Sequence, residues 1–122
     1  MNEMDAAPTT KLKVLAAGSQ TLEQAADLLA DMDAMATRHR TPCGEGDMVW
    51  RRWGDGPPVV LLHGGGGAWS HWVRNIGVLA ERHSVWAADL PGLGDSASPS
   101  RFTVEDVAAP VAAGLQTLLG KT

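Results

Sequence analysis

The feature that most constrains the fold is an apolar run of four residues that ends abruptly in glycines. Residues 59–62 read Val-Val-Leu-Leu and lead directly into His63 and four consecutive glycines. A second short run, residues 85–88, stops in the same way at Asp89 and enters a stretch rich in turn residues. Short apolar runs bounded by turn residues are typical of buried strands. We therefore expect two buried strands, each followed by a loop.

The segment between the two runs, residues 70–82, has the composition of a helix. Ser70 is its expected N-cap, and its expected buried face consists of Trp72, Val73, Ile76, Leu79 and Ala80. Two strands joined through a helix form a βαβ unit, whose right-handed crossover places both strands in one parallel sheet. Ligands of such sheets bind at the carboxyl ends of the strands, where we expect His63, the glycines and Asp89.

The regions on either side are predicted as follows. Residues 1–18 are expected to form a poorly ordered tail, and Thr21 with Gln24 is expected to cap a helix. The apolar stripe of this helix is predicted to consist of Leu22, Ala26, Leu29, Met32 and Ala36. Residues 38–41 and 48–53 are expected to pair as a β-hairpin around a glycine-rich turn. A last helix is expected to start at Thr103, and Pro110 should kink or split it.

Bulk properties exclude several classes of function. The chain has 122 residues, a net charge of -4 and a pI near 5.4, so the clustered basic face of a nucleic-acid-binding protein is missing. The short basic groups at residues 38–40 and 51–52 are interpreted as solvent-exposed strand positions. No apolar run approaches the roughly 20 residues of a membrane span, and we expect a cytoplasmic protein without a membrane partner. The single cysteine, Cys43, excludes an internal disulfide and is predicted to be an unreactive thiol in a turn.

Two motifs in this order resemble a known family. The first is the string of His63 and glycines 64–67, followed by Trp69, and the second is Asp-Leu-Pro-Gly-Leu-Gly-Asp-Ser over residues 89–96. Together they resemble the N-terminal signatures of the α/β-hydrolase superfamily, most nearly its esterases and meta-cleavage-type carbon–carbon hydrolases. The resemblance implies an α/β fold in which residues 38–122 form the N-terminal part of a mostly parallel sheet with flanking helices. Residues 1–37 then form a helical extension that precedes it.

The resemblance also assigns roles to residues. Acyl transfer develops negative charge on a carbonyl oxygen, and bare backbone N–H groups aimed at that oxygen stabilise the transition state. By resemblance, these oxyanion-hole donors are Gly65 and Gly66, while His63, Gly64 and Asp89 are structural residues of the site. The large apolar side chains of Trp69 and Trp72 are candidates for lining an acyl or aromatic substrate pocket, and equally for packing in the core. No cofactor or metal ion is expected, and the partner is a small-molecule substrate.

The nucleophile elbow of the family, G-x-S-x-G, is not found in these 122 residues. The nearest string, residues 94–98, has Ser98 in place of the second glycine and lacks a preceding strand. We therefore expect the chain to supply the oxyanion loop of an ester or carbon–carbon hydrolase without its catalytic triad. The nucleophile could equally be the aspartate of dehalogenases and epoxide hydrolases. On its own the chain should show no triad-dependent activity.

Two other interpretations remain open at this point. One is a truncated, inactive fragment or interaction module, whose strand at residues 59–63 would have an unpaired edge able to bind itself or a complementary chain. The other is half of a dinucleotide-binding Rossmann domain, which shares the order strand, glycine loop, helix, strand and Asp89. The glycine fingerprint of that domain fails, because its third glycine falls on Trp69 or Ser70.

Overall fold

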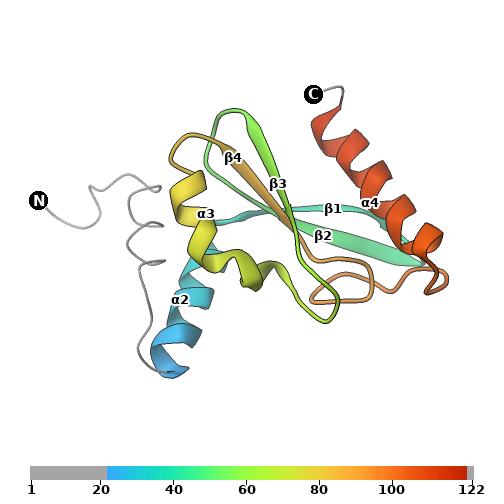
Figure 1. The fold of residues 1–122 in the computed structure, drawn as a ribbon, viewed down its shortest axis with the longest axis horizontal. Helices are drawn as coiled ribbons and strands as arrows, with labels where there is room; N and C mark the ends of the chain where they lie inside the picture. Colours follow the sequence, from blue (N-terminus) through green and yellow to red (C-terminus); the bar gives the residue numbers. More distant parts are fainter. Residues whose placement is uncertain (1–21, 121–122) are drawn as a thin grey trace, which may run out of the picture.

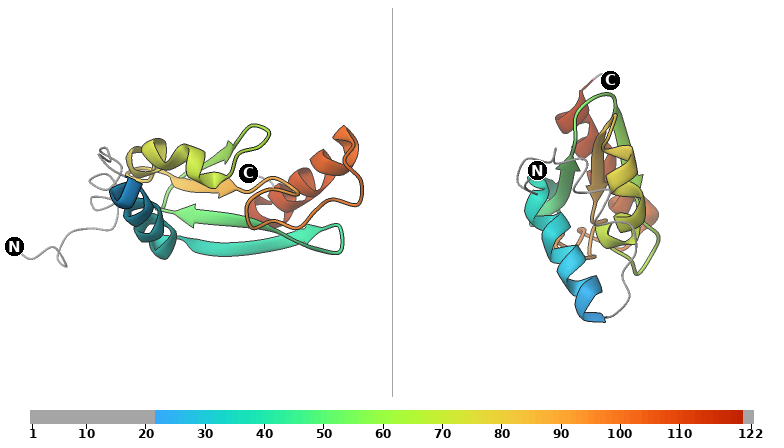
Figure 2. Two further views of the ribbon diagram at one scale, coloured as in Figure 1. Left: turned by 90° about the horizontal axis from the view of Figure 1, so that it is seen from below. Right: turned by 90° about the vertical axis from the view of Figure 1, so that its left-hand side faces the viewer.

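The alternation of apolar side chains along the strands produces a sheet that is covered on both faces. A computed structural model describes residues 22–120, whose strands form one four-stranded sheet. In Figure 1, α2 and α3 lie near one end of the sheet and α4 near the other. The side views of Figure 2 show the same separation. In chain order the elements are α2 (Leu22–Met35), β1 (Thr37–Cys43), β2 (Gly46–Trp53), β3 (Pro58–Leu62), η2 (Trp69–Trp72), α3 (Val73–Leu79), β4 (Ser84–Ala88) and α4 (Val104–Leu119).

The sheet is mixed, with the strand order β1-β2-β4-β3. The predicted hairpin is confirmed: β1 and β2 are antiparallel, and Cys43 faces Gly46 across a two-residue turn at residues 44–45. The predicted parallel pair is confirmed as β3 and β4, whereas β4 pairs with β2 in the antiparallel sense. Within the described sheet β3 lies at an edge and pairs only with β4. The prediction of a buried strand was therefore wrong for β3, in which Val59, Val60 and Leu61 are partly buried and Leu62 is exposed. The described sheet is thus less parallel than predicted, because its parallel part is confined to β3 and β4.

Successive residues of β4 point to opposite faces of the sheet and define two cores. Val85 and Ala87 pack with Trp53 and with apolar side chains of α2 and α3. Trp86 and Ala88 pack with residues of β2 and with partly buried leucines of α4. All five residues of β4 are buried, as the continuous apolar run predicts for a central strand.

The N-terminal helix presents a different face to the core from the one predicted. Leu22 is 91% exposed and Ala26 is also exposed, while Leu28 and Met32 are buried. The helix meets the sheet only near its C-terminal end, where the indole N–H of Trp53 donates to the carbonyl of Met32 at 2.9 Å. The stripe drawn from spacing alone was therefore wrong in its first two turns. The predicted tail and the Thr21 cap lie outside the described residues.

The helix after the glycine loop begins differently from the prediction, although its buried face is confirmed. It opens with the 3₁₀ turn η2, and Ser70 lies inside that turn instead of capping it. Ile76 and Ala80 are buried, and Trp72, Val73 and Leu79 are partly buried against the same core.

The last helix starts as predicted, because the Thr103 side chain accepts a hydrogen bond from the N–H of Asp106 at 3.1 Å. Pro110 does not split it, and α4 continues to Leu119. The helix packs on β1 and β2 at Gly114, where an added Cβ would lie 2.7 Å from the Trp50 ring. Glycine at this position allows the close approach of helix and sheet.

Cys43 was predicted in a turn, but it is the last residue of β1 and is 2% exposed. Its thiol donates to the carbonyl of Ala97 at 3.3 Å. Burial, with the charge of Asp47 as a second cause, raises the pKa of the thiol. A neutral, buried thiol is a poor nucleophile, so the predicted lack of reactivity has a structural cause.

Candidate active-site loop

The glycine loop connects the carboxyl end of β3 to η2 and is open to solvent. A Cβ added at Gly64, Gly65 or Gly66 would meet no atom within 4 Å, and Gly66 has a φ of 76° that favours glycine. The Gly67 N–H donates to the carbonyl of Gly64 at 3.2 Å. Among residues 22–120, the N–H groups of Gly65 and Gly66 have no hydrogen-bond partner. The loop therefore carries two adjacent backbone donors that are free to bind a ligand.

The His63 side chain closes the base of this loop. The ring is buried, its Nε2 lies 3.0 Å from the N–H of Leu90, and its Nδ1 lies 2.7 Å from the carbonyl of Gly64. A backbone N–H can only donate, so Nε2 is the acceptor and Nδ1 carries the proton that it donates to Gly64. Both ring nitrogens are thus engaged in holding backbone, and neither faces a substrate oxygen. The ring thus connects the glycine loop to the backbone after β4, and its role as a structural residue of the site remains a prediction.

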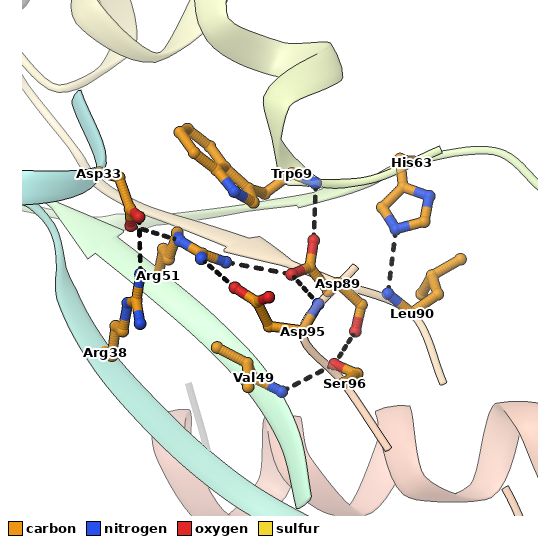
Figure 3. Close-up of polar contacts among 10 residues, drawn as sticks. All are labelled: Asp33, Arg38, Val49, Arg51, His63, Trp69, Asp89, Leu90, Asp95 and Ser96. Atoms are coloured by element: carbon orange, nitrogen blue, oxygen red, sulfur yellow. Dashed lines mark hydrogen bonds and ion pairs between the residues drawn. The ribbon is translucent and has the colours of Figure 1, made fainter. Parts of the chain in front are cut away.

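Asp89 holds the other end of the loop. Its carboxylate is fully buried, and Oδ1 accepts from the N–H of Trp69 at 2.8 Å. Oδ2 accepts from the N–H of Asp95 and from Nη1 of Arg51, both at 3.0 Å. Figure 3 shows these bonds converging on the one carboxylate. Since Leu90 binds His63 and Asp89 binds Trp69, two consecutive residues after β4 fix both ends of the glycine loop.

The turn after Asp89 is folded around the same carboxylate. Gly94 has a φ of 53°, and a Cβ there would lie 2.4 Å from Cγ of Asp89. Ser96 joins this turn to β2, because its hydroxyl donates to the carbonyl of Asp89 at 2.6 Å and accepts from the N–H of Val49 at 2.8 Å. Ser96 thus satisfies backbone groups of two separate segments (Figure 3).

Arg51 was predicted to be solvent-exposed, and this was wrong. It is 1% exposed, and its guanidinium donates to Asp33, Asp89 and Asp95 at 2.8, 3.0 and 2.6 Å. The guanidinium also lies over the Trp69 ring, 4.8 Å from its centroid. The available signal was the strand period, because Arg51 shares a face of β2 with the buried residues Val49 and Trp53.

The ion pairs continue outward from the core into α2. Asp33 accepts from Nε of Arg51 and, through its other oxygen, from Nη2 of Arg38 at 2.6 Å. Partial burial alone would raise the pKa of Asp33, but hydrogen bonds from Arg51 and Arg38 and their positive charges outweigh it. The pKa of this carboxyl is therefore lowered from its usual value of 3.8. Burial opposes the charge of Arg51, and its carboxylate partners reverse that effect and raise its pKa.

The two tryptophans beside the loop lie in the core that faces α2 and α3. Trp69 is 8% exposed, and its ring lies 5.5 Å from that of Trp53. Trp72 is partly buried against the same cluster. The packing role left open by the sequence is thus present in the structure, and contact of either residue with a substrate remains a prediction.

An apolar groove of about 600 Å³ lies beside the site, between the carboxyl end of β3 and α4. Leu62 and Leu90, the neighbours of His63 and Asp89, form one side of it. The other side consists of residues of α4 and the turn before it, namely Phe102, Thr103, Val104, Val107, Ala108, Val111, Ala112 and Leu115. Its lining is almost entirely apolar, in contrast to the ion-pair network on the opposite face of the sheet.

Within residues 22–120, no group of three or more histidine, cysteine, aspartate or glutamate side chains is placed to hold a metal ion. In the same part of the chain, no helix has both the length and the apolar character needed to cross a membrane.

Comparisons with known proteins agree with this geometry. A family model described as the alpha/beta hydrolase fold matches residues 57–122. The soluble epoxide hydrolase of Corynebacterium sp. (strain C12) is 41% identical over 68 residues, which are 56% of this chain and 24% of that protein. The pimeloyl-[acyl-carrier protein] methyl ester esterase of Vibrio vulnificus (strain YJ016) is 36% identical over 62 residues, 51% of this chain and 24% of the esterase. The chain thus spans about a quarter of the length of these relatives.

Solved structures show the same relationship. The ligand-free epoxide hydrolase CorEH superposes with a TM-score of 0.61 and 37% identity, over 68% of this chain and 30% of that one. The haloalkane dehalogenase DatA from Agrobacterium tumefaciens C58 gives a TM-score of 0.62 and 27% identity, over 68% of this chain and 29% of that one.

Proposed function

Because this chain belongs to the α/β-hydrolase family, we propose that residues 63–69 form the oxyanion-binding loop of a hydrolase site. In this proposal the N–H groups of Gly65 and Gly66 donate to the oxygen on which negative charge develops. His63, Gly64 and Asp89 hold the loop, and the nucleophile, acid and base come from residues other than those described.

The observation that supports this role is the pair of unpartnered N–H groups at the carboxyl end of a parallel strand. Neither has a partner among the described residues, whereas the N–H groups of Gly67 and Trp69 on the same loop are both bonded. Backbone donors of this kind cost little reorganisation when they bind an oxyanion, because the surrounding structure already fixes them.

The proposed reaction is hydrolysis of a carboxylic ester or of an activated carbon–carbon bond, with a small-molecule substrate. The esterase relative supports the ester. A second candidate is epoxide hydrolysis, which the relative from Corynebacterium supports through its higher identity. An aspartate nucleophile that opened an epoxide would form an ester with the protein, and hydrolysis of that ester develops the same oxyanion. The loop has the same task in both candidates.

A titration with a tetrahedral anion tests the role of the loop without requiring turnover. Methylphosphonate carries oxygens in the arrangement of a tetrahedral intermediate, and ¹H–¹⁵N spectra of the labelled chain report each amide separately. We expect saturable downfield shifts of the Gly65 and Gly66 N–H resonances, since both would gain a charge-assisted hydrogen bond. An absence of saturable shifts at these two amides would contradict the proposal.

Two substitutions at one position provide the matched control. Gly65→Pro removes the N–H, and the anion-induced shift at Gly66 should then disappear or weaken strongly. Gly65→Ala keeps the N–H. The φ of Gly65 is not positive, so alanine can adopt it, and the added Cβ has no atom within 4 Å. The alanine variant should therefore bind as the unmodified chain does. Equal loss of binding in both variants would show that the loop conformation, and not the donor, was affected.

A further inference from the structure

A single arginine side chain connects three segments that are far apart in the sequence. Nε of Arg51 binds Asp33 of α2, Nη1 binds Asp89 after β4, and Nη2 binds Asp95 in the following turn. The guanidinium is planar and presents its donors in fixed directions, so three partners restrict it far more than one would. Figure 3 shows the three carboxylates arranged around it.

The carboxylate at the centre of this network also supports the glycine loop. Asp89 holds the N–H of Trp69 at 2.8 Å, and the next residue, Leu90, holds the ring of His63 at 3.0 Å. A shift of Asp89 would therefore move both ends of the segment that contains Gly65 and Gly66. Arg51 is the cation that fixes this carboxylate, and the two side chains are 2% and 1% exposed.

The outer end of the network is less buried than its centre. The Asp33 side chain is 29% exposed and is shared between Arg51 and Arg38. Without Asp33, Arg51 would keep Asp89 and Asp95 as partners but lose the contact that sets the direction of its Nε–H. The helix α2 is thus connected to the glycine loop through two ion pairs, Asp33–Arg51 and Arg51–Asp89, and the hydrogen bond from the Trp69 N–H to Asp89.

We propose that Arg51 is a positioning residue for the oxyanion-binding loop, acting through Asp89, and that Asp33 of α2 sets its orientation. This inference rests on the proposed function, because it takes the Gly65 and Gly66 N–H groups to be the donors that need positioning. A purely structural role predicts something different: loss of Arg51 would then lower global stability and leave the loop of every folded molecule unchanged.

Amide hydrogen exchange on the full chain separates the two roles. The exchange rate of Trp69 is compared with that of Val85 in the buried strand β4, which reports global opening. In Arg51→Met, we expect the Trp69 amide to exchange at least about tenfold faster relative to Val85, the factor that 1.4 kcal/mol represents. The imidazole ¹⁵N shifts should also show that the His63 ring no longer occupies only the tautomer with the proton on Nδ1. Asp33→Asn should change the Trp69 to Val85 exchange ratio and the His63 ¹⁵N shifts in the same direction as Arg51→Met, but to a smaller extent.

Arg52→Met is the matched control, because Arg52 is the adjacent residue on the opposite face of β2. Among residues 22–120 its guanidinium pairs with the exposed Asp55 at 3.3 Å and lies over the Trp86 ring, away from the glycine loop. This variant should leave the Trp69 to Val85 ratio and the His63 signals unchanged. If Arg51→Met does not fold, Asp33→Asn decides the question. Unchanged loop signals in the folded variant, or the same change in Arg52→Met, would overturn the inference.

The outcome is independent of the anion titration. A failed titration with an ordered loop would remove the proposed function, and exchange data of the expected kind would still establish the positioning network. Anion binding that survives in Arg51→Met with unchanged affinity would instead leave the function in place and remove the role of Arg51.

Discussion

Replacement of Asp89 by asparagine tests whether this carboxylate organises the loops at the carboxyl ends of β3 and β4. The substitution preserves size and shape, so it creates no cavity. The asparagine oxygen can still accept from the N–H of Trp69, 2.8 Å from Oδ1 in the native chain. Its NH₂ group then faces two donors, the N–H of Asp95 and Nη1 of Arg51, each 3.0 Å from Oδ2. The variant therefore loses two charge-assisted hydrogen bonds and gains two donor–donor contacts.

The magnitude follows from the burial of this group. Hydrogen bonds to charged groups contribute roughly 1.5–3 kcal/mol each, so the loss of two corresponds to about 3–6 kcal/mol. Removal of one partner from a buried ion pair costs about 3–5 kcal/mol by an independent measure. Because Arg51 retains Asp33 and Asp95 as partners, we expect the lower end of both ranges, about 3 kcal/mol. That is a large part of the roughly 5–15 kcal/mol by which domains are stable.

Urea unfolding followed by tryptophan fluorescence measures the effect. With a slope of about 1–3 kcal/mol per molar, the midpoint should fall by roughly 1–3 M without a change in slope. The control is Asp55→Asn, which removes a carboxylate whose side chain is 98% exposed and should leave the midpoint unchanged. A loss below about 1 kcal/mol in Asp89→Asn, judged against the 1.5–3 kcal/mol expected for one such hydrogen bond, would refute the central role assigned to Asp89.

Three further predictions concern other parts of the chain. The lowered pKa of Asp33 contributes stability above the usual value of 3.8, and this stability is lost as the pH falls through the lower folded-state pKa. The difference in urea midpoint between the native chain and Asp33→Asn should therefore shrink between about pH 5 and pH 2, and a constant difference would contradict the prediction. Gly114→Ala places a methyl group 2.7 Å from the Trp50 ring and should lower the free energy of unfolding by about 1–3 kcal/mol, as measured by urea unfolding. An unchanged free energy of unfolding would mean that α4 does not pack on the sheet at this residue. Within the described sheet the edge of β3 is unpaired, so sedimentation velocity should show association that increases with protein concentration. Leu62→Lys should reduce this association because a charge at the edge opposes strand pairing, and a monomer at all concentrations would contradict the prediction.

The central βαβ unit could be predicted because its signals are local. The runs at residues 59–62 and 85–88 predict strands, and the structure has them as β3 and β4. Burial is confirmed for β4 but was wrong for β3, whose residues are partly buried or exposed at the edge of the described sheet. The positions of the glycine loop and of the turn after Asp89 could be predicted, because the turn preferences of glycine and proline do not depend on distant contacts. For the same reason the start of α4 at Thr103 was predicted correctly.

The face of α2 could not be predicted from spacing, because the helix meets the core only near its C-terminal end. Leu22 and Ala26 follow the helical period, but no part of the described sheet reaches them. Leu28 is buried in the core cluster that also contains Trp53 of β2. Periodicity shows which residues of a helix can form a stripe, and the position of the partner decides how much of the stripe is used.

The burial of Arg51 shows where residue type and strand period disagree. The alternation of Val49, Arg51 and Trp53 on one face of β2 predicts a buried position, while a charged side chain predicts an exposed one. The conflict is resolved by three carboxylates, from α2, from the residue after β4 and from the following turn, which approach the guanidinium only in the folded chain. A charge can occupy a core-facing strand position only where such partners converge, because a buried ion without them is too costly to retain. An arginine at a core-facing position of a strand therefore predicts that acidic residues from distant segments meet there. In this chain they meet at the base of the glycine loop.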